Sequence, residues 1–184
     1  QYPLPTPQQL VAARWPKGRS SLSRAILAAA NSFGARDFAD DSILTARNVG
    51  TREYHHLFPD KLLQDAGIDS YLALNCALIT WKTNRTIGRM DPVAYLEARS
   101  AAAPTPQAIA ERLTSHLVPT DELYEAGPYS PTDDAAALAE SVKPDFDAFL
   151  HRRAALIGAA MELLCVGAQP QLSDVLSRSR AARS

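Results

Sequence analysis

Two adjacent histidines, His55 and His56, are the residues of this chain whose types are best suited to chemistry. They lie in the stretch REYHHLFPDKLL (residues 52–63), and the whole chain contains only four histidines. A neutral imidazole can take up a proton near pH 7 and can also bind a divalent metal ion. Polar residues next to Phe58 and Pro59 are, however, also typical of a packed turn. The pair alone therefore leaves a chemical site and a structural turn as open alternatives.

Two asparagines further along the chain favour a chemical site at the histidine pair over a structural turn. Asn75 directly precedes the apolar stretch CALIT (residues 76–80), and Asn84 lies nine positions later, in WKTNRTIG (residues 81–88). Taken singly, Asn75 suits a turn or a cap and Asn84 suits a helix surface, because asparagine favours such positions. Their mutual spacing is the informative feature. It gives the order strand with a histidine pair, loop ending in Asn, strand, and helix with Asn.

The elements that must position these residues are mostly helical. Residues 52–58 and 76–80 are short and rich in aromatic or apolar residues, which predicts two strands. N-cap residues, Pro at the first helical position and Gly stops predict the helices. The fold class is therefore mainly α with a small β-hairpin-like insertion. The helices are expected at residues 6–13, 20–34, 59–67, 81–88, 91–101 and 105–117, with a further short turn within 39–48.

The strongest helix signal follows Pro144. Apolar residues recur there at steps of three or four, which predicts a long C-terminal helix over about residues 144–168. Its apolar stripe comprises Phe146, Phe149, Leu150, Ile157, Met161 and Leu164.

The composition divides the chain into three parts. Residues 1–18 are Pro-rich at their start and are expected to be a linker from a missing upstream domain together with a helix start. Residues 19–170 form the main domain, in which residues 52–92 contain the histidine pair, Asn75 and Asn84. Residues 171–184 are expected to be a polar tail that frays.

The bulk composition excludes several classes of protein. With 184 residues and 46% hydrophobic content, the chain can bury a core and is not disordered. A formal net charge of −1 gives no general basic signal for nucleic acid, although a local patch can still bind it. The two cysteines, Cys76 and Cys165, are far apart, which argues against a disulfide scaffold and suits a reducing cytoplasm. No apolar run approaches the roughly 20 residues of a membrane span.

The order of residues in 52–92 resembles the HNH, or ββα-metal, nuclease motif, embedded here in a helical domain. The step from Asn75 to Asn84 is a spacing found in that family, including the HNH domains of CRISPR effector nucleases. Over roughly residues 52–96, EYHHLFP followed by LNCALITWKTNRTIGRMDPVAYL is similar to the C-terminal HNH domain of GmrSD-type modification-dependent restriction proteins. One branch of that group is the SspE-type phage-defence proteins.

The resemblance implies roles for four residues. His56 matches the general base that activates water, and His55 matches a metal ligand. Asn84 matches the second metal ligand, and Asn75 matches the residue that braces the loop, so His56, Asn75 and Asn84 are the expected catalytic residues. The expected cofactor is a divalent metal ion, with Mg²⁺ preferred and Mn²⁺ or Ni²⁺ also compatible with His and Asn ligands.

The implied function is metal-dependent endonucleolytic cleavage of DNA, with nicking as the default for one site. The implied partners are DNA and an N-terminal nucleotide-binding domain of the same full-length protein. Two alternatives remain open. One is a degenerate HNH fold that binds DNA or a partner domain without cleaving, and the other is a helical interaction module.

Basic residues near the motif allow two interpretations. Lys82, Arg85 and Arg89 fall on one face of a helix, where they would contact DNA phosphates or form a solvated face. Arg152 and Arg153 would add to a DNA surface, but the preceding segment 121–147 has eight acidic residues against one lysine. That acidic segment argues against a DNA contact at these two arginines.

The resemblance also makes a geometric demand. Adjacent residues of a strand point to opposite faces. His55 and His56 therefore serve one site only if the strand ends or bends at them.

Overall fold

The computed structural model describes residues 3–17, 20–38, 40–80, 105–130, 132–167 and 169–181. The helices expected at residues 81–88 and 91–101 lie outside these ranges. Within them the fold is mostly helical with one two-stranded antiparallel sheet, as the sequence predicts. Among the described residues, none of the helices combines the length and the apolar character required to cross a membrane.

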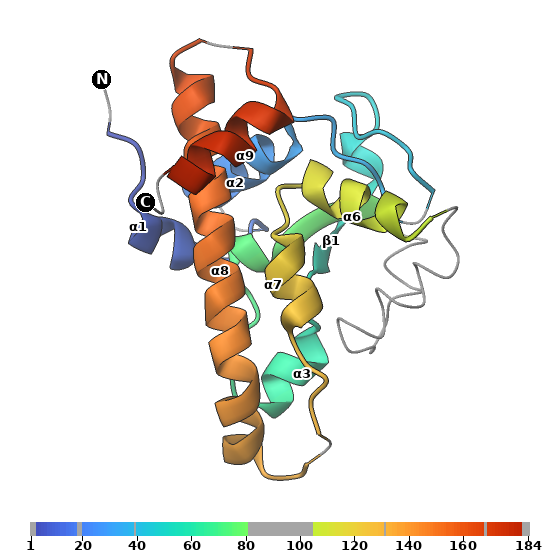
Figure 1. Ribbon diagram of the computed structural model, residues 1–184, viewed down its shortest axis with the longest axis vertical. Helices are drawn as coiled ribbons and strands as arrows, with labels where there is room; N and C mark the ends of the chain where they lie inside the picture. Colours follow the sequence, from blue (N-terminus) through green and yellow to red (C-terminus); the bar gives the residue numbers. More distant parts are fainter. Residues whose placement is uncertain are drawn as a thin grey trace.

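The long helix α8 (Ala135–Cys165) is the centre of the fold and runs along most of its length (Figure 1). Helices α1 (Pro7–Val11), α2 (Ser21–Asn31), α3 (Asp60–Asp65), α7 (Thr120–Glu125) and α9 (Leu172–Ala181) all contact it. The apolar stripe predicted from the sequence faces this core. Its most buried members include Phe146, Phe149, Leu150 and Ile157, which pack with Phe58, Leu10 and Ile26.

Helix α8 begins earlier than its apolar stripe suggests. It starts at Ala135 rather than near 144, because the Asp134 side chain accepts hydrogen bonds from the backbone N–H groups of Ala136 and Ala137 and so caps an Ala-rich first turn. Pro144 lies inside the helix. Burial of Leu138 and Val142 against the core offsets the hydrogen bond that the proline cannot donate.

The C-terminal part also differs from the expectation of a fraying polar tail. Residues Leu172–Ala181 form helix α9, which crosses the upper part of α8 and packs against it (Figure 1). Val175 is fully buried, and Leu172 and Leu176 pack beside it against the core. A narrow apolar stripe of three residues is therefore sufficient to dock an otherwise polar helix.

The strands β1 (Arg52–His56) and β2 (Cys76–Thr80) form the hairpin. They pair antiparallel, with Arg52 opposite Thr80 at one end and His56 opposite Cys76 at the other. The connection between them contains α3 and one turn of 3-10 helix, η2 (Ala73–Asn75). A second such turn, η1 (Val49–Thr51), leads into β1, and over the described residues 40–48 the expected helical turn does not form.

The remaining helix of the described chain is α6 (Pro106–Ser115), which follows the segment that is not described. It begins where the sequence predicts, at the N-cap Thr105, whose side chain accepts a hydrogen bond from the N–H of Ala108. Helix α2 likewise begins after the N-cap Ser20. Local capping signals therefore determined these two helix starts correctly.

Candidate functional site

The histidine pair occupies the last two positions of β1. His55 pairs with Ala77 and His56 with Cys76, and the Leu57 N–H then donates one further hydrogen bond of 3.0 Å to the Asn75 carbonyl. The strand therefore ends at His56, where the chain turns toward Pro59 and α3. This termination is one of the two conditions under which both histidines can serve one site.

The two imidazole rings nevertheless lie against different neighbours. The His55 ring is buried and meets the ring of Phe38 edge-on, with centroids 6.5 Å apart. The His56 ring stacks on the indole of Trp15, with centroids 4.1 Å apart and planes at 20°. Because neighbouring residues of a strand project to opposite faces, the described contacts do not bring the two rings to one point.

His56 has a neutral imidazole with one buried nitrogen that lacks a hydrogen-bond partner among the described residues. Burial lowers its pKa from the usual value of 6.5, and the carboxylate of Asp60 opposes this only in part. The imidazole is therefore neutral at pH 7. Its Nε2 atom is buried and has no hydrogen-bond partner within the described structure. Three other buried side-chain atoms of the described residues also lack a partner, Asn31 Oδ1, Arg52 Nε and His116 Nδ1, and such atoms are often explained by a bound water or a functional role.

Asn75 closes the long connection between the strands. Its side chain is fully buried, and its Oδ1 accepts a hydrogen bond of 2.8 Å from the Phe58 N–H. Its Nδ2 donates to the Phe58 carbonyl at 3.2 Å and to the Ser70 carbonyl at 3.1 Å. One side chain thus ties both ends of the loop together beside the histidine pair.

A buried arginine supports the backbone on both sides of Asn75. Arg153 of α8 is fully buried and donates its hydrogen bonds to backbone carbonyls instead of a carboxylate. Burial lowers its pKa to about 10, so it remains charged at neutral pH. Its acceptors are the carbonyls of Leu74 and Cys76 (2.7 and 2.9 Å) and of His116 and Leu117 (3.1 and 3.3 Å). The burial removes Arg153 from any DNA-binding surface.

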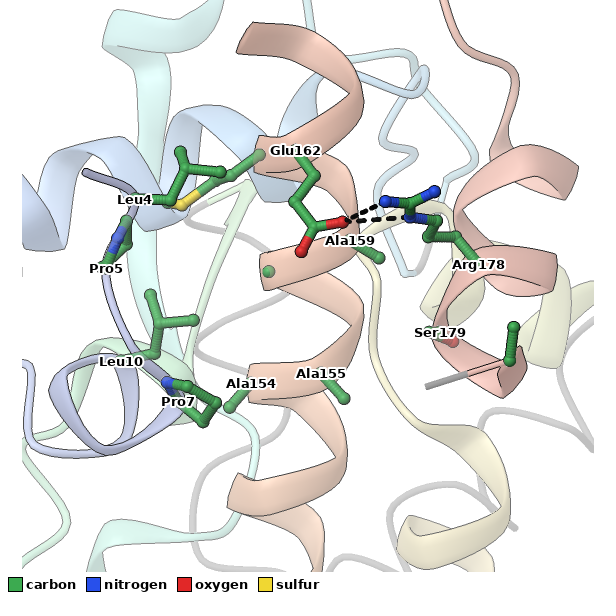
Figure 2. A pocket seen from close by; sticks show the side chains of 13 residues that line it. Leu4, Pro5, Pro7, Leu10, Ala154, Ala155, Ala159, Glu162, Arg178 and Ser179 are labelled. Carbon is green, nitrogen blue, oxygen red and sulfur yellow. Dashed lines mark hydrogen bonds and ion pairs between the residues drawn. The ribbon is translucent and has the colours of Figure 1, made fainter. Parts of the chain in front are cut away.

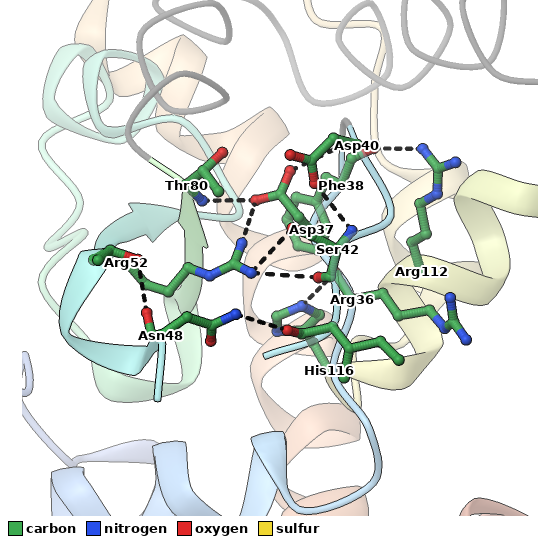
Figure 3. A network of polar contacts seen from close by, with 12 residues as sticks. Arg36, Asp37, Phe38, Asp40, Ser42, Asn48, Arg52, Thr80, Arg112 and His116 are labelled. Carbon is green, nitrogen blue, oxygen red and sulfur yellow. Dashed lines mark hydrogen bonds and ion pairs between the residues drawn. The ribbon is translucent and has the colours of Figure 1, made fainter. Parts of the chain in front are cut away.

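The opposite end of the hairpin is held by an ion pair (Figure 3). Asp37 Oδ2 accepts hydrogen bonds from Arg52 Nη1 at 3.0 Å and from the Thr80 N–H at 2.6 Å. Arg52 Nη2 also donates to the hydroxyl of Ser42 at 3.0 Å. The Asp37 and Arg52 side chains are 0% and 2% exposed. This cluster, Asp37–Arg52–Thr80, fixes the end of β2 from which residues 81–104 continue.

Sequence reasoning missed Asp37, Arg52 and Arg153 as residues that position the hairpin. Arg52 is the first residue of the stretch that was singled out, yet its partner lies 15 positions earlier. Arg153 meets its acceptors 36 to 79 positions away. No local pattern marks such long-range partners, and only the isolated charge within an apolar helix stripe hints at Arg153.

The other predicted site residues lie outside the described part of the chain. Asn84, Lys82, Arg85 and Arg89 all belong to this group. Among the described residues, no group of three or more His, Cys, Asp and Glu side chains is arranged to hold a metal ion. A ligand set of one imidazole and one amide oxygen would not form such a group, and it fits a weakly held ion whose other ligands are water and substrate.

A cavity of about 550 Å³ lies elsewhere, between the N-terminal segment and helices α8 and α9 (Figure 2). Its walls are mainly apolar, and the ion pair of Glu162 with Arg178, 3.0 Å apart, borders it. Of the predicted site residues that the structure describes, His55, His56 and Asn75, none lines this cavity.

His116 and Cys76 are structural residues. The His116 ring packs edge-on against Phe38, and its Nε2 donates a hydrogen bond of 2.7 Å to the Arg36 carbonyl. Burial lowers the His116 pKa to about 4. The thiol of Cys76 is fully buried, which raises its pKa to about 12 and keeps it protonated.

Comparison of the chain with known protein families, with curated proteins and with solved structures gave no match in any of the three.

Proposed function

We propose that this chain is a metal-dependent DNA endonuclease domain of the HNH type, and that it nicks DNA as the nuclease part of a modification-dependent restriction or phage-defence protein. The observation that carries the proposal is the hairpin that ends at His56 and is closed by the buried side chain of Asn75. An antiparallel hairpin with a histidine pair at its end and a braced connecting loop is what the ββ part of a ββα-metal arrangement requires, and it supports the proposal.

His56 is the proposed general base. Hydrolysis of a phosphodiester requires a water molecule that loses its proton as it attacks phosphorus. A neutral imidazole whose Nε2 has no protein partner in the described structure is suited to accept that proton. A protonated imidazole could not do so, and the burial that lowers the pKa therefore favours the active form.

His55 and Asn84 are the proposed ligands of a divalent ion, with Mg²⁺ preferred and Mn²⁺ or Ni²⁺ as alternatives. When bound, such an ion supplies positive charge that stabilises the developing charge on the phosphate. Neither ligand is anionic, so the ion is expected to bind weakly without DNA. The His55 ring is buried and packs edge-on against Phe38, which restricts its orientation.

DNA is the proposed partner, with Lys82, Arg85 and Arg89 as contacts to its phosphates. We also propose an upstream nucleotide-binding domain in the same full-length protein, in the cytoplasm. Both proposals derive from the resemblance over residues 52–96.

A second candidate function is DNA or partner binding without cleavage. It is favoured by the different faces on which the two histidine rings lie. If the described arrangement persists with DNA, only one of the two imidazoles can reach the scissile phosphate.

Supercoiled plasmid distinguishes the two functions. The wild-type chain is incubated with plasmid and Mg²⁺ or Mn²⁺, beside His56→Ala, Asn84→Ala and the matched control His151→Ala, whose histidine lies exposed on α8. Conversion to open circle by wild type and the control, and loss of conversion in the two site variants, supports the nuclease. Equal inertness of all four with a retained mobility shift of the DNA supports binding alone.

A further inference from the structure

The N-terminal segment is built into the loop beside the histidine pair. The Trp15 N–H donates a hydrogen bond of 2.9 Å to the Tyr71 carbonyl, and the Ala73 N–H donates one of 2.8 Å to the Ala13 carbonyl. Arg14 and Leu72 lie opposite each other in this antiparallel bridge. Residues 13–15 therefore pair, strand-like, with residues 71–73, just before Asn75.

This bridge is anchored at both sides. Leu10 of α1 and Ala13 are buried, and α1 packs against α8. The side chain of Arg14 forms an ion pair with Asp69 of the same loop. The backbone of Trp15 is thus held in place independently of its own side chain.

The Trp15 side chain lies directly on the His56 ring. The indole and imidazole stack at 4.1 Å, while the Tyr71 ring meets the imidazole edge-on at 5.1 Å and 87°. Tyr71 also meets the indole edge-on, with centroids 5.5 Å apart. The two rings that contact the imidazole therefore belong to Trp15 and Tyr71, whose backbones both form part of the bridge.

Packing contributes to the orientation of the His56 ring, because its Nε2 makes no hydrogen bond within the described structure. Rotation about the bond to an imidazole ring has a broad torsional preference, so a nitrogen without a hydrogen bond does not fix the plane of the ring. A flat indole against its face restricts that rotation, and offset stacking adds attraction beyond simple burial.

We propose that Trp15 is a positioning residue for His56: the bridge of residues 13–15 with 71–73 places the indole against the imidazole and fixes the plane in which His56 presents its nitrogen. The role in cleavage rests on the proposed function of His56 as general base. The orientation of the His56 ring does not depend on that proposed function, and it can be measured even if the protein does not cleave DNA.

The test combines NMR with single-turnover nicking, at one fixed pH, on the full chain. Trp15→Leu removes the aromatic face, Trp15→Phe retains a smaller one, and Tyr124→Leu replaces an exposed aromatic residue of α7 as the matched control. The carbon-bound imidazole protons of His56 are identified by their loss in His56→Ala. A stacked indole shifts these signals upfield and gives nuclear Overhauser contacts between the two rings.

We expect the upfield shift to disappear in Trp15→Leu, to persist in part in Trp15→Phe and to be unchanged in Tyr124→Leu. Because small misplacements of catalytic groups are costly, we expect nicking to slow by on the order of 10- to 100-fold in Trp15→Leu at unchanged DNA affinity, with partial rescue in Trp15→Phe.

Normal His56 signals in Trp15→Leu, or displaced signals with an unchanged nicking rate, would overturn the proposal. If Trp15→Leu does not fold, the wild-type ring-to-ring contacts decide, and their absence overturns it. A wild-type chain that does not nick DNA contradicts the proposed function instead, and the NMR result then decides the orientation by itself.

Discussion

The two ends of the β1–β2 hairpin are held by different sets of contacts. At the Arg52–Thr80 end, a buried carboxylate and guanidinium pair with each other and with the backbone. At the His56–Cys76 end, the Asn75 amide, stacked aromatic rings and the Arg153 guanidinium hold the chain, none of which is a carboxylate. Each end also contains one buried nitrogen without a hydrogen-bond partner in the described structure, Arg52 Nε at the first end and His56 Nε2 at the second. The ends therefore differ in the groups that hold them, a buried ion pair at the first and stacked aromatic rings at the second.

The largest expected effect comes from breaking the structural end. Asp37→Ala leaves the Arg52 guanidinium buried without its carboxylate, and removal of one partner from a buried pair typically costs about 3–5 kcal/mol of stability. Urea denaturation measures the loss. The matched control is Asp147→Ala, which breaks the exposed Lys143–Asp147 pair and is expected to change stability by less than about 1 kcal/mol. Equal effects in the two variants would contradict a structural role for Asp37.

Acid should lower the stability of the fold by protonating His116. Its pKa is about 4 in the folded chain and 6.5 when unperturbed, so the unfolded chain binds more protons between these values. The free energy of unfolding is therefore not reduced by His116 above pH 6.5. It decreases as the pH falls toward 4, by about 3 kcal/mol in total for this group.

His116→Gln provides the comparison for this acid effect. Its amide can still donate to the Arg36 carbonyl but does not titrate, so its stability should fall less steeply over the same pH range. Denaturation at several pH values measures both slopes. Parallel slopes in wild type and His116→Gln would show that His116 does not titrate as its burial indicates.

A smaller loss of stability is expected at the histidine end. Asn75→Ala removes three hydrogen bonds and leaves the buried polar groups of Phe58 and Ser70 without that partner, which we expect to cost about 2–3 kcal/mol. Asn75→Asp should not restore stability, because a carboxylate cannot donate to the two carbonyls. If Asn75→Asp were as stable as wild type, the proposed bracing by the Nδ2 group would be wrong.

Sequence reasoning found the features of this fold that depend on local patterns. The two strands follow from short β-prone stretches, and the starts of α2 and α6 follow from Ser20 and Thr105 at their N-caps. The same reasoning placed the start of α8 too late, since it treated Pro144 as a helix start. It also treated α9 as a fraying tail, since three apolar residues among polar ones give a weak periodic signal.

The sequence predicted the residues of the candidate site better than it predicted the residues that hold them in place. His55, His56 and Asn75 were singled out together, and the structure places them at one end of the hairpin. Trp15, Asp37 and Arg153 were not, because each contacts the hairpin from a position distant in the sequence. Long-range packing decides which polar atoms are satisfied, and this information is absent from spacing alone.

The central claim is that the histidine end of the hairpin cuts DNA with His56 as general base. Its most direct test is single-turnover nicking of supercoiled plasmid by His56→Gly, with and without added imidazole, under conditions in which wild type nicks. Loss of a general base is expected to slow nicking by about 10²- to 10⁴-fold, and imidazole that enters the vacated space should restore part of the rate. Nicking by His56→Gly at the wild-type rate without imidazole would contradict the claim.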